Sequence, residues 1–193
     1  SIVELGAGSS RKTRVLLEAG RRQGDLEMFV PLDVSGSILE ETAQNLRTAY
    51  PGLEVAWDLH DFTEHLDVLP GLSPHLLVFL GSTIGNLHEG PAAAFLEDVG
   101  SALGTEDHFL LGTDLVKDPR VLEAAYNDRE GVTAEFNKNV LRVLNRELDA
   151  DFDLEAFHHR AVWVPGERQI EMHLVSEREQ TVHLPPLDLE VSF

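Results

Sequence analysis

Short apolar runs alternate with amphipathic stretches from the first residue to about residue 118. The run at 76–80 is continuously apolar, as expected of a strand that is covered on both faces. Helical spacing follows several of the runs, and this alternation is typical of a mainly parallel sheet. We expect strands at residues 2–5, 28–32, 53–55, 76–80 and 109–113, and helices at 13–19, 38–46 and 91–103. The pattern predicts an α/β fold with a doubly wound, mainly parallel sheet.

The pattern changes after residue 118. Two further helices are expected at 119–126 and 132–148. Apolar and polar residues then alternate over 161–164, 169–175 and 181–184, which is typical of antiparallel hairpins. The turns are expected at Pro165-Gly166 and near Glu177-Arg178. We therefore predict a core at 1–118, with 119–193 adding helices and antiparallel strands to the same compact domain.

Composition excludes several classes of protein. The chain has 193 residues, 42% of them apolar, which suits one domain. No apolar run approaches the roughly 18 residues of a membrane span. The absence of cysteine excludes disulfides and thiolate catalysis. The nine histidines are scattered without the spacing of a zinc motif, so we expect no metal and place these histidines on the surface.

Charge points to the kind of ligand. The chain carries 34 acidic and 15 basic residues, a formal charge of −19. Such a surface repels phosphate backbones, so nucleic acid is not expected as a partner, and a small amine or zwitterion suits it better. Both ends of the sequence lie against or inside strand patterns, so we expect a fragment of a larger protein.

Acidic residues and glycines stand at the ends of the first expected strands. Glu4 leads into the turn Gly6-Ala7-Gly8-Ser9-Ser10, whose glycines let a ligand approach the backbone closely. Asp33 ends the second strand and can accept two ribose hydroxyls. Asp61 can accept from an adenine amino group while the Phe62 N–H donates to a ring nitrogen. The alternative is structural: Asp33 caps the next helix and Asp61 is a solvated loop acid.

The turn favours S-adenosylmethionine over a dinucleotide. The dinucleotide fingerprint needs a third glycine, where this chain has Arg11. S-adenosylmethionine has no phosphate, and its tail offers an ammonium and a carboxylate. An acid and backbone amides can hold that pair, with Lys12 as a partner for the carboxylate. An NAD-dependent oxidoreductase is also opposed by the lack of an evident proton relay.

Four segments together resemble one family, the histidine-specific S-adenosylmethionine-dependent methyltransferases. The segments are residues 4–13, 79–87, 111–118 and 136–141. Generic methyltransferases share only the first. The resemblance implies that the protein methylates L-histidine to its Nα-trimethylated betaine, hercynine, in the first step of ergothioneine biosynthesis. It covers nearly the whole chain.

The resemblance also implies roles for individual residues. Asn86 and Tyr126 would bind the α-amino acid part of the substrate, and Met172 would lie near the imidazole. Gly81 would lie between substrate and cofactor. The cofactor would contact Glu4, Gly6, Gly8, Ser9, Lys12, Asp33, Asp61, Phe62 and Gly81. The structural alternatives are a turn or a helix N-cap for Asn86, and core packing for Tyr126 and Met172.

Methyl transfer from a sulfonium is an in-line displacement, so positioning the amine contributes most of the catalysis and no catalytic acid or base is expected. In the family, segments outside residues 1–193 supply aromatic residues to the substrate pocket, and a glutamate and a serine that contact the imidazole. Two alternatives stay open: a methyltransferase of another small amine or amino acid, and a non-catalytic adenosyl-binding domain. We expect a cytoplasmic monomer without membrane partners.

Overall fold

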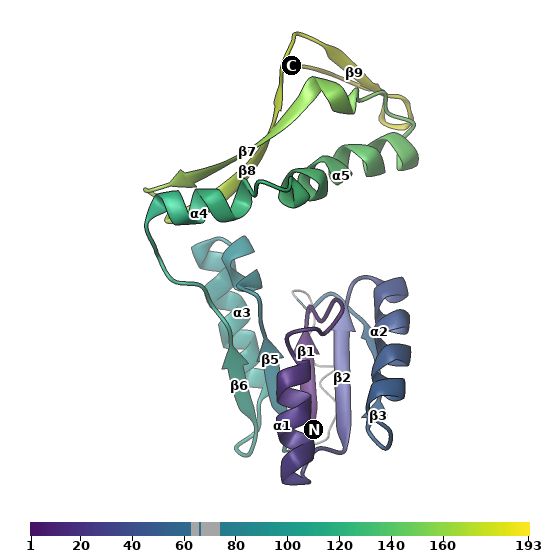
Figure 1. The fold of residues 1–193 in the computed structure, drawn as a ribbon, viewed down its shortest axis with the longest axis vertical. Helices are drawn as coiled ribbons and strands as arrows, with labels where there is room; N and C mark the ends of the chain where they lie inside the picture. The colour runs from purple at the N-terminus through teal and green to yellow at the C-terminus, as the bar shows by residue number, and fades with distance from the viewer. Residues whose placement is uncertain (63–65, 67–73) are drawn as a thin grey trace. The chain divides into compact units, whose positions relative to one another are not determined.

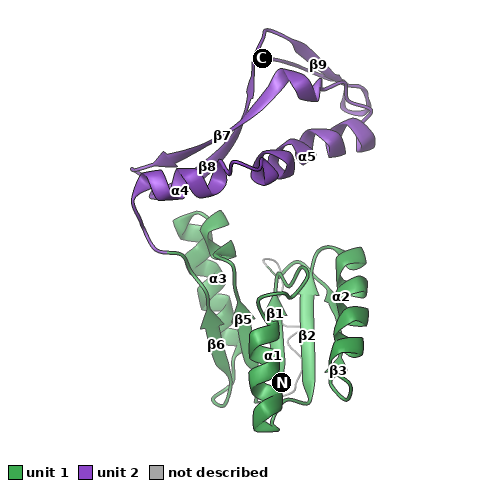
Figure 2. Cartoon of the chain, in the orientation of Figure 1, with its two compact units in different colours: residues 1–114 green, residues 115–193 purple. Residues whose placement is uncertain are grey.

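The computed structural model describes residues 1–62, 66 and 74–193 (Figure 1). The chain divides into two compact units, residues 1–114 and 115–193 (Figure 2). The expected single compact domain, with its boundary at residue 118, stays a prediction.

The first unit is built on a parallel sheet. Its strands are β1 (Ile2–Leu5), β2 (Met28–Asp33), β3 (Glu54–Val55), β4 (Asp58–Leu59), β5 (Leu76–Phe79) and β6 (His108–Leu111). They lie in the order β3-β2-β1-β5-β6, with β4 also paired to β2, and all pairs are parallel. The predicted mainly parallel sheet is therefore confirmed. The two-residue strand β4 had no recognisable apolar pattern in the sequence.

Helices cover the sheet on both faces because successive strand residues point to opposite sides. Helices α1 (Arg14–Gln23) and α2 (Gly36–Ala49) place Leu17 and Leu46 against Phe29 and Val78. Helix α3 (Glu89–Ala102) packs through Phe95 and Val99 on the opposite face. This arrangement is doubly wound, as predicted.

The second unit contains two helices and two separate strand pairs. Its elements are α4 (Pro119–Tyr126), α5 (Val132–Glu147), β7 (Phe157–Val164), β8 (Gln169–Ser176), β9 (Thr181–Leu184) and β10 (Leu189–Ser192). Strands β7 and β8 form the antiparallel hairpin expected across Pro165-Gly166. The hairpin expected near Glu177-Arg178 is wrong, because β9 pairs with β10 and not with β8.

Strand β9 combines a buried apolar face with its pairing to β10. Val182 and Leu184 are buried in a cluster with Leu141 and Phe157. At the open end of the pair, Gln180 and Phe193 exchange both backbone hydrogen bonds, at 3.2 and 2.9 Å. The apolar face of β9 thus stays on the core of the second unit, and the end of the chain supplies its partner strand.

The structure bears on the expected surface position of the histidines and on metal binding. His75 is buried, with Nδ1 3.0 Å from Oδ1 of Asp107 but outside hydrogen-bond geometry, so the expected surface position of the histidines is wrong for this residue. Among the described residues no group of His, Asp and Glu is arranged to hold a metal ion. None of the described helices combines the length and apolar character needed to cross a bilayer.

Candidate functional site

The loop after β1 follows a left-handed path that its residue types allow. Gly6 and Gly8 have φ values of +64° and +49°, which glycine adopts without steric cost. Ser10 has φ +48° and adopts this conformation as a strained, non-glycine residue. The Ser10 N–H donates to the Ala7 carbonyl at 2.8 Å, and the Ala7 N–H donates to the Leu32 carbonyl at 2.9 Å. These bonds fix the loop against the end of β2.

A second loop follows β5 and begins with two more left-handed residues, Gly81 at φ +81° and Ser82 at +61°. Ser82 donates its N–H to the Gly112 carbonyl at 3.0 Å, and its hydroxyl accepts from the Asp114 N–H. A Cβ built on Gly81 would lie 3.0 Å from Nζ of Lys12. The Lys12 ammonium therefore lies directly beside Gly81.

A cavity of about 600 Å³ lies between these two loops. It opens at the carboxyl ends of β1 and β5, where open α/β sheets bind their ligands. Five of the residues predicted to serve the cofactor line it: Glu4, Gly6, Ser9, Lys12 and Gly81. The other lining residues are Ala7, Ser10, Arg11, Leu80 and Thr83.

Glu4 lines this cavity and is almost completely buried. Only 4% of the residue is exposed. Its Oε1 accepts a hydrogen bond from the Thr13 hydroxyl, whereas Oε2 has no partner in hydrogen-bond geometry in the described part of the chain. Burial raises the pKa of Glu4 from 4.5 to about 7, against the opposing effects of the Thr13 and Ser10 hydroxyls and the Lys12 charge.

Asp33 holds the glycine turn from the end of β2. Its Oδ2 accepts from the Gly8 N–H at 2.9 Å, and its Oδ1 accepts from the Ser35 N–H at 3.1 Å. Ser35 is the N-cap of α2, so Asp33 supports that helix start without being the cap. From α2, the Thr42 hydroxyl donates to the Gly8 carbonyl at 2.9 Å. Both backbone polar groups of Gly8 are thus bound by side chains.

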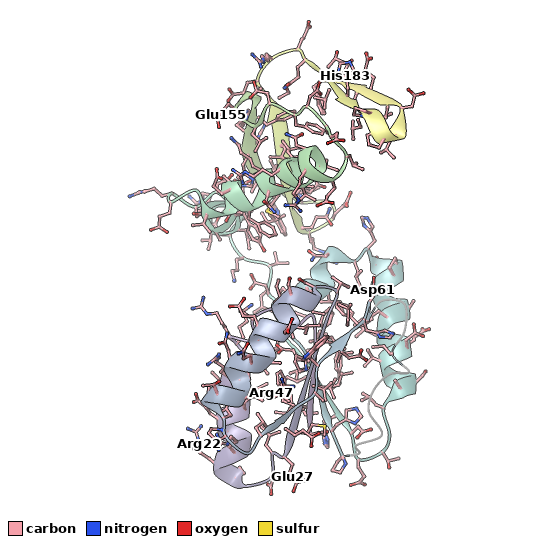
Figure 3. The ribbon with its side chains drawn as sticks, turned by 90° about the vertical axis from the view of Figure 1, so that its right-hand side faces the viewer. Arg22, Glu27, Arg47, Asp61, Glu155 and His183 are labelled. Atoms are coloured by element: carbon pink, nitrogen blue, oxygen red, sulfur yellow. The ribbon has the colours of Figure 1, made fainter. Side chains whose placement is uncertain are left out.

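Asp61 and Phe62 follow β4 at the same end of the sheet. Figure 3 shows Asp61 at this end of the first unit and Glu27, which precedes β2, at the opposite end. The Phe62 ring lies 3.5 Å from where a Cβ of Gly6 would be. It packs against Phe79 with ring centres 5.2 Å apart. The structure therefore brings Phe62 next to the glycine turn, with the exposed Asp61 as its neighbour in sequence.

Asn86 is exposed at the end of a 3₁₀ turn, Thr83–Asn86, that continues from the Gly81 loop. Helix α3 begins at Glu89 with His88 as its N-cap, so the alternative of Asn86 as the helix cap is wrong. Pro91 lies in the first turn of that helix and does not begin it. Asn86 is a turn residue whose side chain faces solvent.

Tyr126 and Met172 lie in the second unit. Tyr126 is the last residue of α4 and is 40% exposed, while Met172 on β8 is 38% exposed. Both are too exposed for the core-packing alternative, which is wrong for these two residues. The second unit thus presents both side chains at its surface.

The end of α4 is fastened to β7 by side chains that the sequence did not single out. The Asn127 side chain donates to the Ala161 carbonyl at 3.0 Å and accepts from the Ala161 N–H at 2.8 Å. Nε2 of His159 donates to the Tyr126 carbonyl at 2.7 Å, because a carbonyl can only accept. Nδ1 of His159 then accepts from the Asn137 amide at 3.0 Å. These contacts fix the backbone of Tyr126.

The family model described as histidine-specific methyltransferase, SAM-dependent, matches residues 1–193. The chain belongs to this family. S-adenosylmethionine is accordingly its cofactor. Within this family the chain is 51% identical, over its whole length, to the histidine N-alpha-methyltransferase of Mycobacterium tuberculosis, and 50% identical to that of Mycolicibacterium smegmatis. It spans 60% of the length of each.

The fold of this family member is also found in a solved methyltransferase. The CcbJ methyltransferase from Streptomyces caelestis matches with a TM-score of 0.50 and 14% sequence identity, over 100% of this chain and 63% of that one. This likeness concerns the fold alone. It agrees with the parallel sheet and the flanking helices described above.

The cavity suits the cofactor of the family by its chemistry. Glu4 and Lys12 place a carboxyl and an ammonium on its walls, which complement the charges of an amino-acid tail. Two buried polar atoms, Oε2 of Glu4 and Oγ of Ser10, meet no partner in hydrogen-bond geometry among the described residues, although the Ser10 hydroxyl lies near enough to the Glu4 carboxyl to lower its pKa. Buried polar groups are nearly always bonded in native proteins, so these two atoms mark a place for a polar ligand.

The sequence analysis did not identify the residues that hold Glu4 and Gly8 in place through hydrogen bonds. Thr13 and Thr42 are buried polar residues that bond to Glu4 and to Gly8. Thr42 gave one detectable indication, because it occupies the buried, otherwise apolar face of α2 with Leu39, Ala43 and Leu46. Thr13 precedes a helix, where threonine is ordinary, so its role had no such indication.

Proposed function

We propose that the intact protein transfers methyl groups from S-adenosylmethionine to the α-amino nitrogen of L-histidine. The product would be Nα,Nα,Nα-trimethylhistidine, hercynine, in ergothioneine biosynthesis. The observation that carries the proposal is the family match over residues 1–193. The names of the two mycobacterial relatives support the same reaction.

For the cofactor we assign the residues around the first-unit cavity. Glu4 and Lys12 would hold the ammonium and carboxylate of the amino-acid tail against Gly6 and Ser9, which line the cavity with them. Gly8, Asp33, Asp61 and Phe62 do not line this cavity and are assigned to the cofactor from the resemblance and from their place beside the same turn. Asp33 accepts one backbone hydrogen bond on each oxygen, and each oxygen has a further lone pair for a ribose hydroxyl. Asp61 and the Phe62 backbone would contact the adenine.

For the substrate we assign Asn86, Tyr126, Met172 and Gly81. Asn86 offers both an amide donor and an amide acceptor at an exposed turn, which suits an amino acid that carries an amine and a carboxylate. The Tyr126 hydroxyl would add a further partner. Met172 would lie against the imidazole, and Gly81, without a side chain, leaves space between substrate and cofactor.

The chemistry asks the protein chiefly to hold two molecules in line. When bound, S-adenosylmethionine supplies an electrophilic methyl group. Asn86 and Tyr126 would orient the α-nitrogen, whose lone pair is free once its proton has been lost to solvent, and this alignment provides most of the rate. Repeated methylation needs room around the nitrogen, so few contacts to it are an advantage.

We also propose that the protein works as a cytoplasmic monomer that binds neither nucleic acid nor membranes. The formal charge of −19 supports the absence of nucleic-acid and membrane partners, because it disfavours association with nucleic acids and anionic membranes. Ultracentrifugation of the intact protein at several concentrations tests the oligomeric state. A mass that rises with concentration would contradict the monomer.

Calorimetry on the intact protein tests the proposed function. S-adenosylhomocysteine is titrated first, and L-histidine is then added to the saturated complex. Asn86→Ala should weaken histidine binding and leave S-adenosylhomocysteine binding nearly unchanged. His88→Ala, a change at the neighbouring exposed N-cap, is the matched control and should alter neither. Equal loss of both ligands in Asn86→Ala would contradict the substrate role.

A further inference from the structure

One end of the Glu4 carboxyl group is buried without a partner at the wall of the cavity. Oε1 is bonded to the Thr13 hydroxyl, but Oε2 has no hydrogen bond within the described residues. The residue is 4% exposed, so solvent does not supply the missing partner freely. A buried carboxylate oxygen without a donor is costly, and the fold retains it at the place where a ligand would enter.

The groups around Glu4 leave its charge poorly compensated. The loop after β1 brings the hydroxyls of Thr13 and Ser10 and the ammonium of Lys12 toward it. Asp33 at the end of β2 adds a second negative charge. Its register neighbours on the two flanking strands are Pro31 of β2 and Val78 of β5, which carry no charge. From the β5 side the cavity wall adds Leu80, Gly81 and Thr83, which are also uncharged. Arg11 also lines the cavity, and Lys12 is the cation that lowers the pKa of Glu4. Both of these cations are exposed.

The balance of these effects favours the neutral carboxyl group in the cavity without ligand. Burial raises the pKa of Glu4 to about 7, despite the lowering effects of Thr13, Ser10 and Lys12. A ligand ammonium beside Oε2 would change this balance in two ways. It would add a positive charge at short range, and it would donate the hydrogen bond that Oε2 lacks.

We propose that Glu4 selects ligands that carry an ammonium group, and that its carboxyl group releases a proton to solvent when such a ligand binds. The inference rests on the proposed function, since it takes the amino-acid tail of the cofactor as the ligand. In the exchange the Glu4 O–H bond breaks, and its electron pair stays on the carboxylate. The proton passes to the buffer, and the ligand ammonium keeps its own protons.

Two ligands with the same nucleoside should differ in the proton release that accompanies their binding. S-adenosylhomocysteine carries the ammonium, whereas 5′-methylthioadenosine lacks the amino-acid tail. Only the first should expel the proton. Its affinity should rise about 20-fold between pH 5.5 and 7.5, where Glu4 loses its proton in the free protein. The affinity of 5′-methylthioadenosine should stay nearly constant over the same range.

The test is calorimetry of the intact protein at pH 6.5 in buffers of different ionisation enthalpy. Roughly three-quarters of a proton should be released per S-adenosylhomocysteine bound, as follows from a pKa of about 7, and almost none per 5′-methylthioadenosine. Glu4→Gln has nearly the same shape and no proton to lose. It should abolish the proton release and the pH dependence, and bring the affinities of the two ligands closer together.

Equal proton release with both ligands, or release that persists in Glu4→Gln, would overturn the inference while leaving a nucleoside site in place. Failure of both ligands to bind the wild-type protein would overturn the proposed function and this inference with it. The wild-type comparison of the two ligands needs no variant, so the inference is decided even if Glu4→Gln does not fold.

Discussion

The Gly8 amide donates to Oδ2 of Asp33 at 2.9 Å, which ties the turn after β1 to the end of β2. The residue assigned to the ribose therefore also shapes the loop assigned to the amino-acid tail. Substitution of Asp33 affects two parts of the site at once. Variants that remove one acceptor, or the support from α2, are needed to separate them.

Asp33→Ala should weaken S-adenosylhomocysteine binding by at least about 100-fold, because two hydrogen bonds to a charged acceptor are lost. Asp33→Asn keeps one acceptor oxygen and should lie between Asp33→Ala and the wild type. Calorimetry measures both. Asp25→Ala removes an exposed acid beyond α1 and serves as the control. Unchanged affinity in Asp33→Ala would contradict the ribose assignment.

Thr42→Val tests the support of the glycine turn from α2. The change keeps the shape of the side chain but removes the donor to the Gly8 carbonyl. We expect a loss of about 1 kcal/mol in the free energy of unfolding and a several-fold weaker cofactor affinity. Thr48→Val is the matched control, since Thr48 is exposed on the same helix and bonds only to Gln44 of its own helix. Similar effects of both variants on cofactor binding would refute the role of Thr42.

Glu4 makes the stability of the first unit depend on pH. Its pKa is about 7 in the folded protein and 4.5 ordinarily, so between these values the folded state holds more protons than the unfolded state. Stability from this group is therefore fully present below about pH 4.5 and falls as pH rises toward 7, by on the order of 3 kcal/mol.

Urea denaturation measures this effect through the fluorescence of Trp57, with Trp163 of the second unit replaced by Phe. Other carboxyl groups also titrate, so the informative quantity is the difference between wild type and Glu4→Gln at each pH. That difference should change between about pH 4.5 and 7 and level off outside this window. A constant difference would show that Glu4 titrates normally.

His159 should act as a positioning residue for Tyr126. His159→Ala removes the donor to the Tyr126 carbonyl and the acceptor for Asn137. We expect several-fold weaker histidine binding, with unchanged affinity for S-adenosylhomocysteine. His158→Ala is the matched control. His158 is the exposed neighbour of His159, and its Nδ1 lies 3.3 Å from Oε1 of Glu177. Weakening of both ligands to the same extent would indicate a general structural effect.

Strands β1, β2 and β5 were predictable because they are mostly apolar and buried, and each ends at or just before a glycine or an acidic residue. The two-residue strand β4 carried no such pattern. The partner of β9 was not predictable, since the strand patterns of β8 and β10 are both compatible with pairing. In the structure Val182 and Leu184 are buried in a cluster with Leu141 of α5 and Phe157 of β7, which are contacts between segments distant in the sequence.

In the candidate site, too, some features were predictable from the sequence and others depend on tertiary packing. The residues on the loops, such as Lys12 and Gly81, were predicted because short motifs carry them. The uncompensated end of Glu4 and the support from Thr13 and Thr42 arise only when separate elements pack together. The local sequence does not indicate which polar atom is left without a partner after folding.

The most direct test of the central claim is the product of the intact protein incubated with S-adenosylmethionine and L-histidine. Mass spectrometry and NMR of the product identify the number of methyl groups and the nitrogen that carries them. We expect three methyl groups on the α-nitrogen and none on the imidazole. Methylation of an imidazole nitrogen, or no methylated histidine while another amine is methylated, would contradict it.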